Sequence, residues 1–187
     1  MDGVSILEAL GATAQLPIHP APADMYKAAM RRFAGGVTVV TGRGKNGELV
    51  GMTATAVCSL SADPPALLVC ANRSGSFATH ISVAAPFSVH LLAADQVDVA
   101  RLCAGMSGAK GGERFAGPGW DQDKEGVPVL ANVLARFDCV ATSLIPTSTH
   151  LLTIGHVTAV HLAPQHDAAL AYFDGNFVAV TRDGTRH

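Results

Sequence analysis

The stretch GMTATAVCSLSADPPALLVC, from Gly51 to Cys70, reads as two strands separated by a sharp turn. Its first part is unusual for a strand that faces a core, because small hydroxylated side chains stand in place of bulky ones: Thr53, Thr55, Ser59 and Ser61. Asp63-Pro64-Pro65 marks the turn, since proline cannot donate to a strand ladder. Small polar side chains before such a turn suit a surface on which a flat, polar ligand lies against backbone. A strand with one face in water, rich in threonine for its β propensity, is the alternative.

Short strands with turn signals surround this stretch. The β-branched run at 37–41 and the return segment LVGMTATAV (49–57) flank Asn46-Gly47, a strong hairpin signal, and are expected to pair antiparallel. Further strands are predicted at 66–71, after Pro86, at 134–144, at 150–162 and, once or twice, within LAYFDGNFVAV. Helices are predicted at 23–33, 76–83 and 95–103. Because strands and helices do not alternate regularly, the pattern favours a mainly β fold, an antiparallel barrel with peripheral helices.

Composition limits the classes of protein. The 187 residues are 49% hydrophobic with a net charge of −2, so a sizeable core is available and no overall field favours nucleic acid or a membrane surface. We expect an N-terminal arm at 1–22, extended by its prolines, and one domain at 23–187. No apolar run reaches the roughly 18 residues of a membrane span, and the N-terminus does not resemble a signal peptide. A cytoplasmic location is therefore expected.

Short catalytic and metal motifs are absent from the sequence. His156, His161 and His166 are five residues apart, whereas zinc sites bring ligands closer together, so no metal is expected. No G-x-S-x-G occurs, and GRGKNG lacks the lysine and hydroxyl of a phosphate-binding loop. The four cysteines form no C-x-x-C pair and lie among apolar residues, which predicts four reduced, buried thiols: Cys58, Cys70, Cys103 and Cys139.

Six ordered blocks together resemble the flavin reductase-like family, the small reductase components of two-component flavin monooxygenases. FAGGVTVVT resembles its first strand, and GMTATAVCSLSADPPALLVCANRSGS resembles its flavin-binding block. The later blocks are FSVHLLAADQVDVARLCAGMSG, PVLANVLARFDCVA, THLLTIGHV and AYFDGNF, so the similarity extends over about Met25 to Val180. Within the family, the chain resembles the reductases of 4-hydroxyphenylacetate oxidation and of pyrimidine degradation. His156 departs from the pattern, because an acidic residue is common at that position.

The resemblance implies a fold and an activity. The expected fold is a homodimeric split β-barrel that binds FMN or FAD. The expected reaction is reduction of that flavin by NADH or NADPH, often followed by its transfer to a separate oxygenase. Apolar residues on both faces of HLLTIGHVTAVHL (150–162) also favour a dimer. A flavin-binding barrel without catalysis, and a barrel that binds no flavin, are the alternatives.

The resemblance also implies site residues. The isoalloxazine and ribityl chain would lie along Thr53, Thr55 and Ala56, with Ser59 at the ring edge. The phosphate would approach Asn72, Arg73 and Ser76, and further phosphate or nucleotide candidates are Lys110 and Arg114. The nicotinamide would face His150, the catalytic candidate, and the turn Gly175–Phe177. The remaining cofactor-binding candidates are Gly51, Met52, Ala54 and Phe115.

Overall fold

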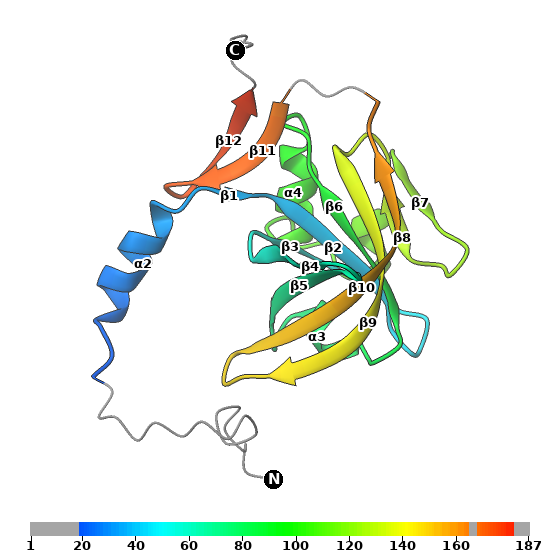
Figure 1. Cartoon of the computed structure of the whole chain (residues 1–187). Helices are drawn as coiled ribbons and strands as arrows, with labels where there is room; N and C mark the ends of the chain where they lie inside the picture. Colours follow the sequence, from blue (N-terminus) through cyan, green and yellow to red (C-terminus); the bar gives the residue numbers. More distant parts are fainter. Residues whose placement is uncertain (1–18, 165–167, 182–187) are drawn as a thin grey trace.

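The computed structural model describes residues 19–164 and 168–181 (Figure 1). Most of the predicted arm, and His166, therefore lie outside the described residues. The mainly β prediction is confirmed. The largest sheet has seven antiparallel strands in the order β3-β2-β6-β9-β10-β5-β4. Its strands are β2 (Thr38–Arg43), β3 (Leu49–Ala54), β4 (Val57–Ala62), β5 (Pro65–Asn72), β6 (Pro86–Leu91), β9 (Ala135–Pro146) and β10 (His150–Leu162).

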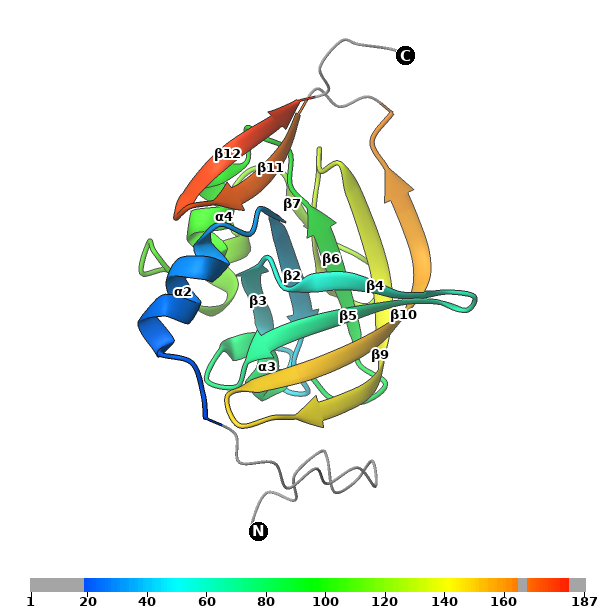
Figure 2. The ribbon, with the colours of Figure 1, turned by 60° about the vertical axis from the view of Figure 1, so that its left-hand side comes forward.

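The two edges of this sheet are consecutive in the chain. β3 and β4 stand at opposite ends of the strand order, yet only Thr55 and Ala56 separate them. The sheet must therefore curl until its edges meet, as Figure 2 shows for β3, β4 and β5. The prediction of one strand over 49–57 is wrong at this point, because the chain leaves β2 after Ala54 and pairs with β5 from Val57. Among the described strands β3 and β4 do not pair, so the sheet is curved but not closed.

Two smaller sheets extend the molecule. β1 (Gly35–Gly36), β11 (Ala168–Phe173) and β12 (Asn176–Thr181) form a three-stranded sheet, and β7 (Trp120–Gln122) pairs with β8 (Pro128–Leu130). The helices are α2 (Ala23–Arg31), α3 (Ser76–His80), α4 (Val97–Cys103) and the 3-10 turn η1 (Gly111–Phe115). α2 extends away from the sheets in Figure 1, and none of its residues is buried. In the described part of the chain, no helix is long and apolar enough to cross a membrane.

The core lies inside the curled sheet. Val40, Val69, Val89 and the edge-to-face pair Phe77 and Phe87, with ring centroids 5.9 Å apart, belong to one buried cluster. A second cluster joins β2 to α4 and the three-stranded sheet. Apolar area removed from water in these two clusters supplies the main driving force for folding.

The prediction of four buried thiols is only half right. Cys103 and Cys139 are buried, but Cys70 is half-buried and Cys58 is exposed, all four being free thiols. β4 is an edge strand with neighbours on one side only, so the side chain of Cys58 remains in water.

Candidate functional site

A cavity of about 450 Å³ lies beside the point where the two sheet edges meet, and we call it the seam cavity. It falls within the range of 300–1,000 Å³ that is typical of small-molecule sites. β3 and the seam form one wall, the end of β5 and the start of α3 form another, and α4 and η1 contribute single side chains. The lining residues are Gly51–Ala56, Cys70, Asn72, Ser74–Ser76, Cys103–Ala104, Arg114 and His150.

Arg114 joins the glycine-rich segment, SGAKGGERFAGPGW at residues 107–120, to the wall of the cavity. Its Nη1 donates a hydrogen bond of 2.9 Å to the carbonyl of Gly51, and its Nε donates one of 3.1 Å to Ala109. The Ser76 hydroxyl lies 3.4 Å from the same Gly51 carbonyl. A Cβ at Gly51 would approach the Phe115 ring to 2.8 Å, so glycine permits this close packing. The guanidinium thus keeps a donor-rich, cationic group at the cavity.

The two threonines of β3 and the seam differ in what their hydroxyls do. Thr53 donates a 2.6 Å hydrogen bond to the carbonyl of Ala100, which ties β3 to α4. Thr55 is exposed at the seam and lines the cavity, and no side-chain hydrogen bond of Thr55 occurs within the described residues. Its hydroxyl is therefore available to a ligand, whereas that of Thr53 is already committed to the fold.

The end of β5 supplies polar groups on the opposite wall. The Asn72 carboxamide oxygen accepts hydrogen bonds from the backbone N–H and the hydroxyl of Ser74, at 3.0 and 2.8 Å. This Asx-type turn leads into α3 and holds Ser74 and Ser76 at the cavity. Arg73 points elsewhere, because its Nη1 donates to the Thr147 carbonyl at 3.0 Å and it does not line the cavity.

His150 begins β10 opposite Asn72, where the two strands pair. Its Nδ1 lies 2.8 Å from the Thr149 hydroxyl, and its backbone N–H donates to the Thr147 hydroxyl. The side chain is exposed and lines the cavity. The register of β5 and β10 therefore brings His150, from the block THLLTIGHV, beside the predicted flavin-binding block.

Several candidates lie outside the lining of the seam cavity. Ser59 is exposed on β4, Lys110 precedes η1, and Phe115 packs edge-to-face on Trp120 with ring centroids 4.9 Å apart. The turn at Gly175 and Phe177 joins β11 to β12, and Phe177 packs against Tyr172. The structure thus gathers Gly51–Ala56, Asn72, Ser76, Arg114 and His150 at the seam cavity. The candidates that do not line it are Ser59, Arg73, Lys110, Phe115, Gly175 and Phe177.

Sequence reasoning missed two thiols of the lining. Burial raises the pKa of Cys103 to about 12, against the opposing effect of Arg114, and the thiol is neutral near pH 7. Burial, with a smaller effect of the nearby Cys58, also raises the pKa of Cys70. Neither thiol is prepared as a nucleophile, because thiolate rather than thiol is the reactive form. Their position beside the seam followed only from the pairing of β5 and the packing of α4.

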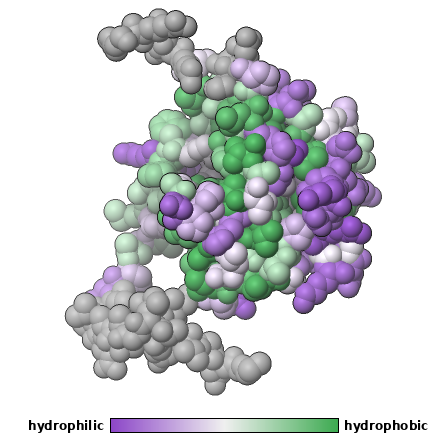
Figure 3. Space-filling view, turned by 45° about the vertical axis from the view of Figure 1, so that its right-hand side comes forward, coloured by the Kyte–Doolittle hydropathy of each residue, from purple (hydrophilic) through white to green (hydrophobic). Residues whose placement is uncertain are grey.

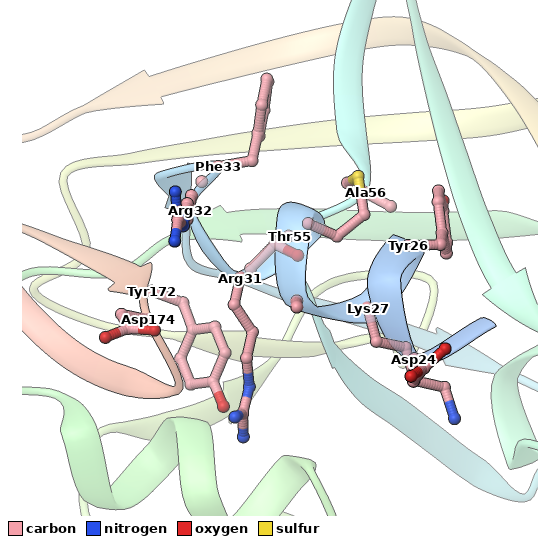
Figure 4. A pocket seen from close by; sticks show the side chains of 13 residues that line it. Asp24, Tyr26, Lys27, Arg31, Arg32, Phe33, Thr55, Ala56, Tyr172 and Asp174 are labelled. Carbon is pink, nitrogen blue, oxygen red and sulfur yellow. The ribbon is translucent and has the colours of Figure 1, made fainter. Parts of the chain in front are cut away.

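A second, larger cavity of about 950 Å³ lies between α2 and the β11–β12 hairpin, and we call it the α2 cavity (Figure 4). Thr55 and Ala56 line both cavities, so the two meet at the seam. Within residues 19–164 and 168–181, no cluster of three or more histidine, cysteine or acidic residues could hold a metal ion.

The donor set of the seam cavity fits a flavin mononucleotide. Arg114 can donate to a phosphate, and so can the Ser74 and Ser76 hydroxyls if they rotate away from their present acceptors on Asn72 and Gly51. The edge strands β3 and β4 each leave one side without a strand partner among the described residues, so backbone N–H and C=O groups can bond the polar edge of a ring. Small side chains at Ala54, Thr55 and Ala56 leave room for a ring to approach the backbone.

Comparisons with known proteins show which proteins this chain is similar to. Residues 30–181 match the family described as the flavin reductase like domain. The FMN reductase (NADH) RutF 2 of Rhizobium rhizogenes is 34% identical over 179 residues, which cover 93% of this chain and all of that protein. A protein from Haemophilus somnus, described as a putative flavin reductase, superposes with a TM-score of 0.78 at 31% identity, over 86% of this chain and 100% of that one. BorF, the flavin reductase component of a bacterial two-component tryptophan halogenase, gives a TM-score of 0.76 at 30% identity, over 87% and 100%.

Proposed function

The chain belongs to the flavin reductase-like domain family, and from this we propose that it is an NADH-dependent reductase of FMN or FAD. The observation that carries the proposal is the seam cavity, in which the backbone between two sheet edges faces Arg114 and the hydroxyls of Ser74 and Ser76. The FMN and NADH in the name of the Rhizobium relative support the choice of substrates. We also infer that the curled sheet is a split β-barrel, since its two edges are joined by only two residues.

The protein's part in the reaction is mainly to bind and orient. Flavin and nicotinamide themselves supply the hydride chemistry when both are bound. Arg114, Ser74 and Ser76 would hold the phosphate, and Thr55 with the seam backbone would bond the ring edge. His150 would orient the nicotinamide from the far wall and donate a hydrogen bond to it. This division of labour needs no catalytic triad, and the protonated thiols of the lining take no covalent part.

A direct assay tests the proposal. The purified protein should oxidise NADH when FMN or FAD is added, with loss of nicotinamide absorbance. A matrix of two flavins against NADH and NADPH would establish the preferred pair. The absence of nucleotide consumption with either flavin would contradict the proposal.

A flavin-binding protein without catalysis is the second candidate, because the same cavity would serve it. Such a protein would quench flavin fluorescence on binding but would not bleach the visible flavin absorbance when NADH is added. The two functions are thus separated by one anaerobic titration.

Delivery of reduced flavin to a partner oxygenase is part of the proposal. BorF is described as one component of a two-component halogenase, and the present chain matches it over 87% of its length. A partner would be recognised if its product formed only when this reductase and NADH were both present. Excess catalase should not abolish that product if the oxygenase consumes reduced flavin rather than peroxide.

We further infer a homodimer. Leu60 on β4, and Val160 and Leu162 on β10, have exposed fractions of 50, 51 and 74%, which is unusual for large apolar side chains. Figure 3 shows that hydrophobic residues also gather in the middle of one face, beside a hydrophilic area. A second copy could cover such surfaces. Light scattering should give twice the 19.2 kDa of one chain, and a stable monomer at micromolar concentration would contradict the inference.

A further inference from the structure

The α2 cavity is lined by three cations on and just after α2. Lys27, Arg31 and Arg32 contribute to its wall, against the two carboxylates of Asp24 and Asp174. Within the described residues none of the three cations forms an ion pair, although five other basic residues do so with nearby carboxylates: His80, Arg101, Lys124, Arg136 and His161. A concave surface with unpaired cations in excess favours an anionic ligand.

Arg31 is held at the end of the cavity nearest the hairpin. Its carbonyl accepts a 2.7 Å hydrogen bond from the backbone N–H of Asp174, which joins α2 to the β11–β12 turn. Its Nη2 lies 3.5 Å from the place where a Cβ on Gly175 would stand, so the guanidinium lies over that turn. Gly175 has a φ of 82°, a conformation that glycine adopts without strain. The turn and the helix therefore position a planar, bidentate donor toward the cavity.

Aromatic surfaces accompany the cations. Tyr26, Phe33 and Tyr172 line the cavity, and the Tyr172 ring is supported edge-to-face by Phe177 at a centroid distance of 5.3 Å. In the view of Figure 4, Tyr172 and Asp174 lie toward one end, Lys27 and Asp24 toward the other, and Thr55 between them. Aromatic faces and guanidinium groups together match a purine attached to phosphates.

The contact between the two cavities indicates which ligand the α2 cavity binds. Because Thr55 and Ala56 line both, a molecule in the α2 cavity can meet a ring in the seam cavity at the seam. We propose that the α2 cavity binds the adenosine diphosphate half of NADH, with the Arg31 guanidinium on the pyrophosphate. This rests on the proposed reductase function, and it adds a subsite that supplies affinity for the dinucleotide away from the reacting ring.

Binding without turnover gives the first test. ADP-ribose contains the adenosine diphosphate half but no nicotinamide, so calorimetric titration reads the subsite without any reaction. Arg31→Ala should weaken ADP-ribose binding by about tenfold, the usual effect of losing one charge-assisted phosphate contact. Lys45→Ala is the matched control, since Lys45 is an exposed cation of the β2–β3 turn and lines neither cavity.

Steady-state kinetics give the second test. Reduced nicotinamide mononucleotide lacks the adenosine half, so the ratio of kcat/KM for NADH to kcat/KM for the mononucleotide isolates the subsite. That ratio should fall by about tenfold in Arg31→Ala and stay within about twofold of the parent in Lys45→Ala. Lys27→Ala should lower it in the same direction, which keeps the test usable if Arg31→Ala fails to fold.

The outcomes separate the subsite from the reductase function. An unchanged ADP-ribose affinity in both Arg31→Ala and Lys27→Ala, or no binding of ADP-ribose by the parent protein, would overturn the proposed subsite even if NADH is consumed. Equal losses with NADH and the mononucleotide would also overturn it, because they would place Arg31 at the reacting ring. If no nucleotide is consumed at all, the reductase function fails, while the titration still reports on the subsite.

Discussion

The Arg114 guanidinium and the Gly51 carbonyl are joined by a 2.9 Å hydrogen bond across 63 residues of sequence. This bond connects the glycine-rich segment after α4 to the strand that forms one wall of the seam cavity. Because the carbonyl belongs to the backbone, only the guanidinium end of the contact can be removed by substitution. Arg114 can also turn a remaining donor toward an anion in the cavity.

Arg114→Ala should weaken flavin binding by about tenfold, since it removes a cation and releases the η1 segment from β3. Arg114→Lys should recover part of the loss, because it restores the charge but not the two-directional hydrogen bonds to Gly51 and Ala109. Fluorescence quenching of FMN measures the affinity, and Lys45→Ala, which removes an exposed cation that lines neither cavity, is the control for general charge. Equal affinities for Arg114→Ala and the parent would contradict this role.

Thr53 and Thr55 provide a matched pair. Thr53→Val should lower the free energy of unfolding by about 1 kcal/mol, because it removes the hydroxyl donor to the Ala100 carbonyl. Thr55→Val should leave stability nearly unchanged and weaken flavin binding, with turnover at saturating flavin less affected. Urea unfolding and flavin titration of both variants check the assignment. Loss of flavin affinity in Thr53→Val alone would contradict the assignment of Thr53 to the fold and Thr55 to the ligand.

His150 is predicted to govern the nucleotide step. His150→Ala should lower the NADH-dependent rate by about ten- to a hundredfold, the effect expected when a positioning group is lost. Flavin affinity should change only a few-fold, because the phosphate donors lie on other residues. Single-turnover mixing of flavin-loaded enzyme with NADH measures this rate. Should the variant instead lose flavin and keep its rate at saturating flavin, His150 belongs to the flavin site.

His90 makes folding stability depend on pH. It is fully buried, its Nδ1 lies 3.0 Å from the Val39 carbonyl, and its Nε2 has no partner among the described residues. Burial lowers the pKa of His90 from 6.5 to about 4; Arg136 acts in the same direction, and the Val39 carbonyl and Asp138 act against it. The folded state therefore favours the neutral ring, whereas the unfolded chain takes up a proton below pH 6.5.

His90 should therefore leave the free energy of unfolding unchanged above pH 6.5. As the pH drops from 6.5 toward 4, the free energy of unfolding should fall by roughly 3 kcal/mol. Urea midpoints at about pH 7.5 and about pH 5 measure the loss. His90→Gln keeps an N–H donor for the Val39 carbonyl and should flatten this dependence. A parent protein with equal midpoints at both pH values would contradict the prediction.

Much of the fold followed from local sequence signals. Asn46-Gly47 predicted the hairpin of β2 and β3, which the structure confirms, because this dipeptide adopts the backbone angles of a tight turn with little strain. Asp63-Pro64-Pro65 predicted the reversal between β4 and β5, also confirmed. The absence of regular βαβ alternation indicated a mainly β fold, and the family blocks carried the flavin and NADH prediction. These properties depend on a few neighbouring residues or on ordered motifs, so the sequence alone contains them.

Tertiary structure decided where the chain leaves one edge of the sheet and joins the other. LVGMTATAV has an uninterrupted strand pattern, and nothing local marks Thr55-Ala56 as a break, because both parts suit extended backbone. The break arises since β3 pairs with β2 and β4 pairs with β5, and the curl of seven strands brings those two edges together. The same long-range pairing placed His150 opposite Asn72 and packed the glycine-rich segment onto Gly51. Contacts between residues far apart in sequence depend on the free energy of the whole packed sheet, which no short stretch of the chain specifies.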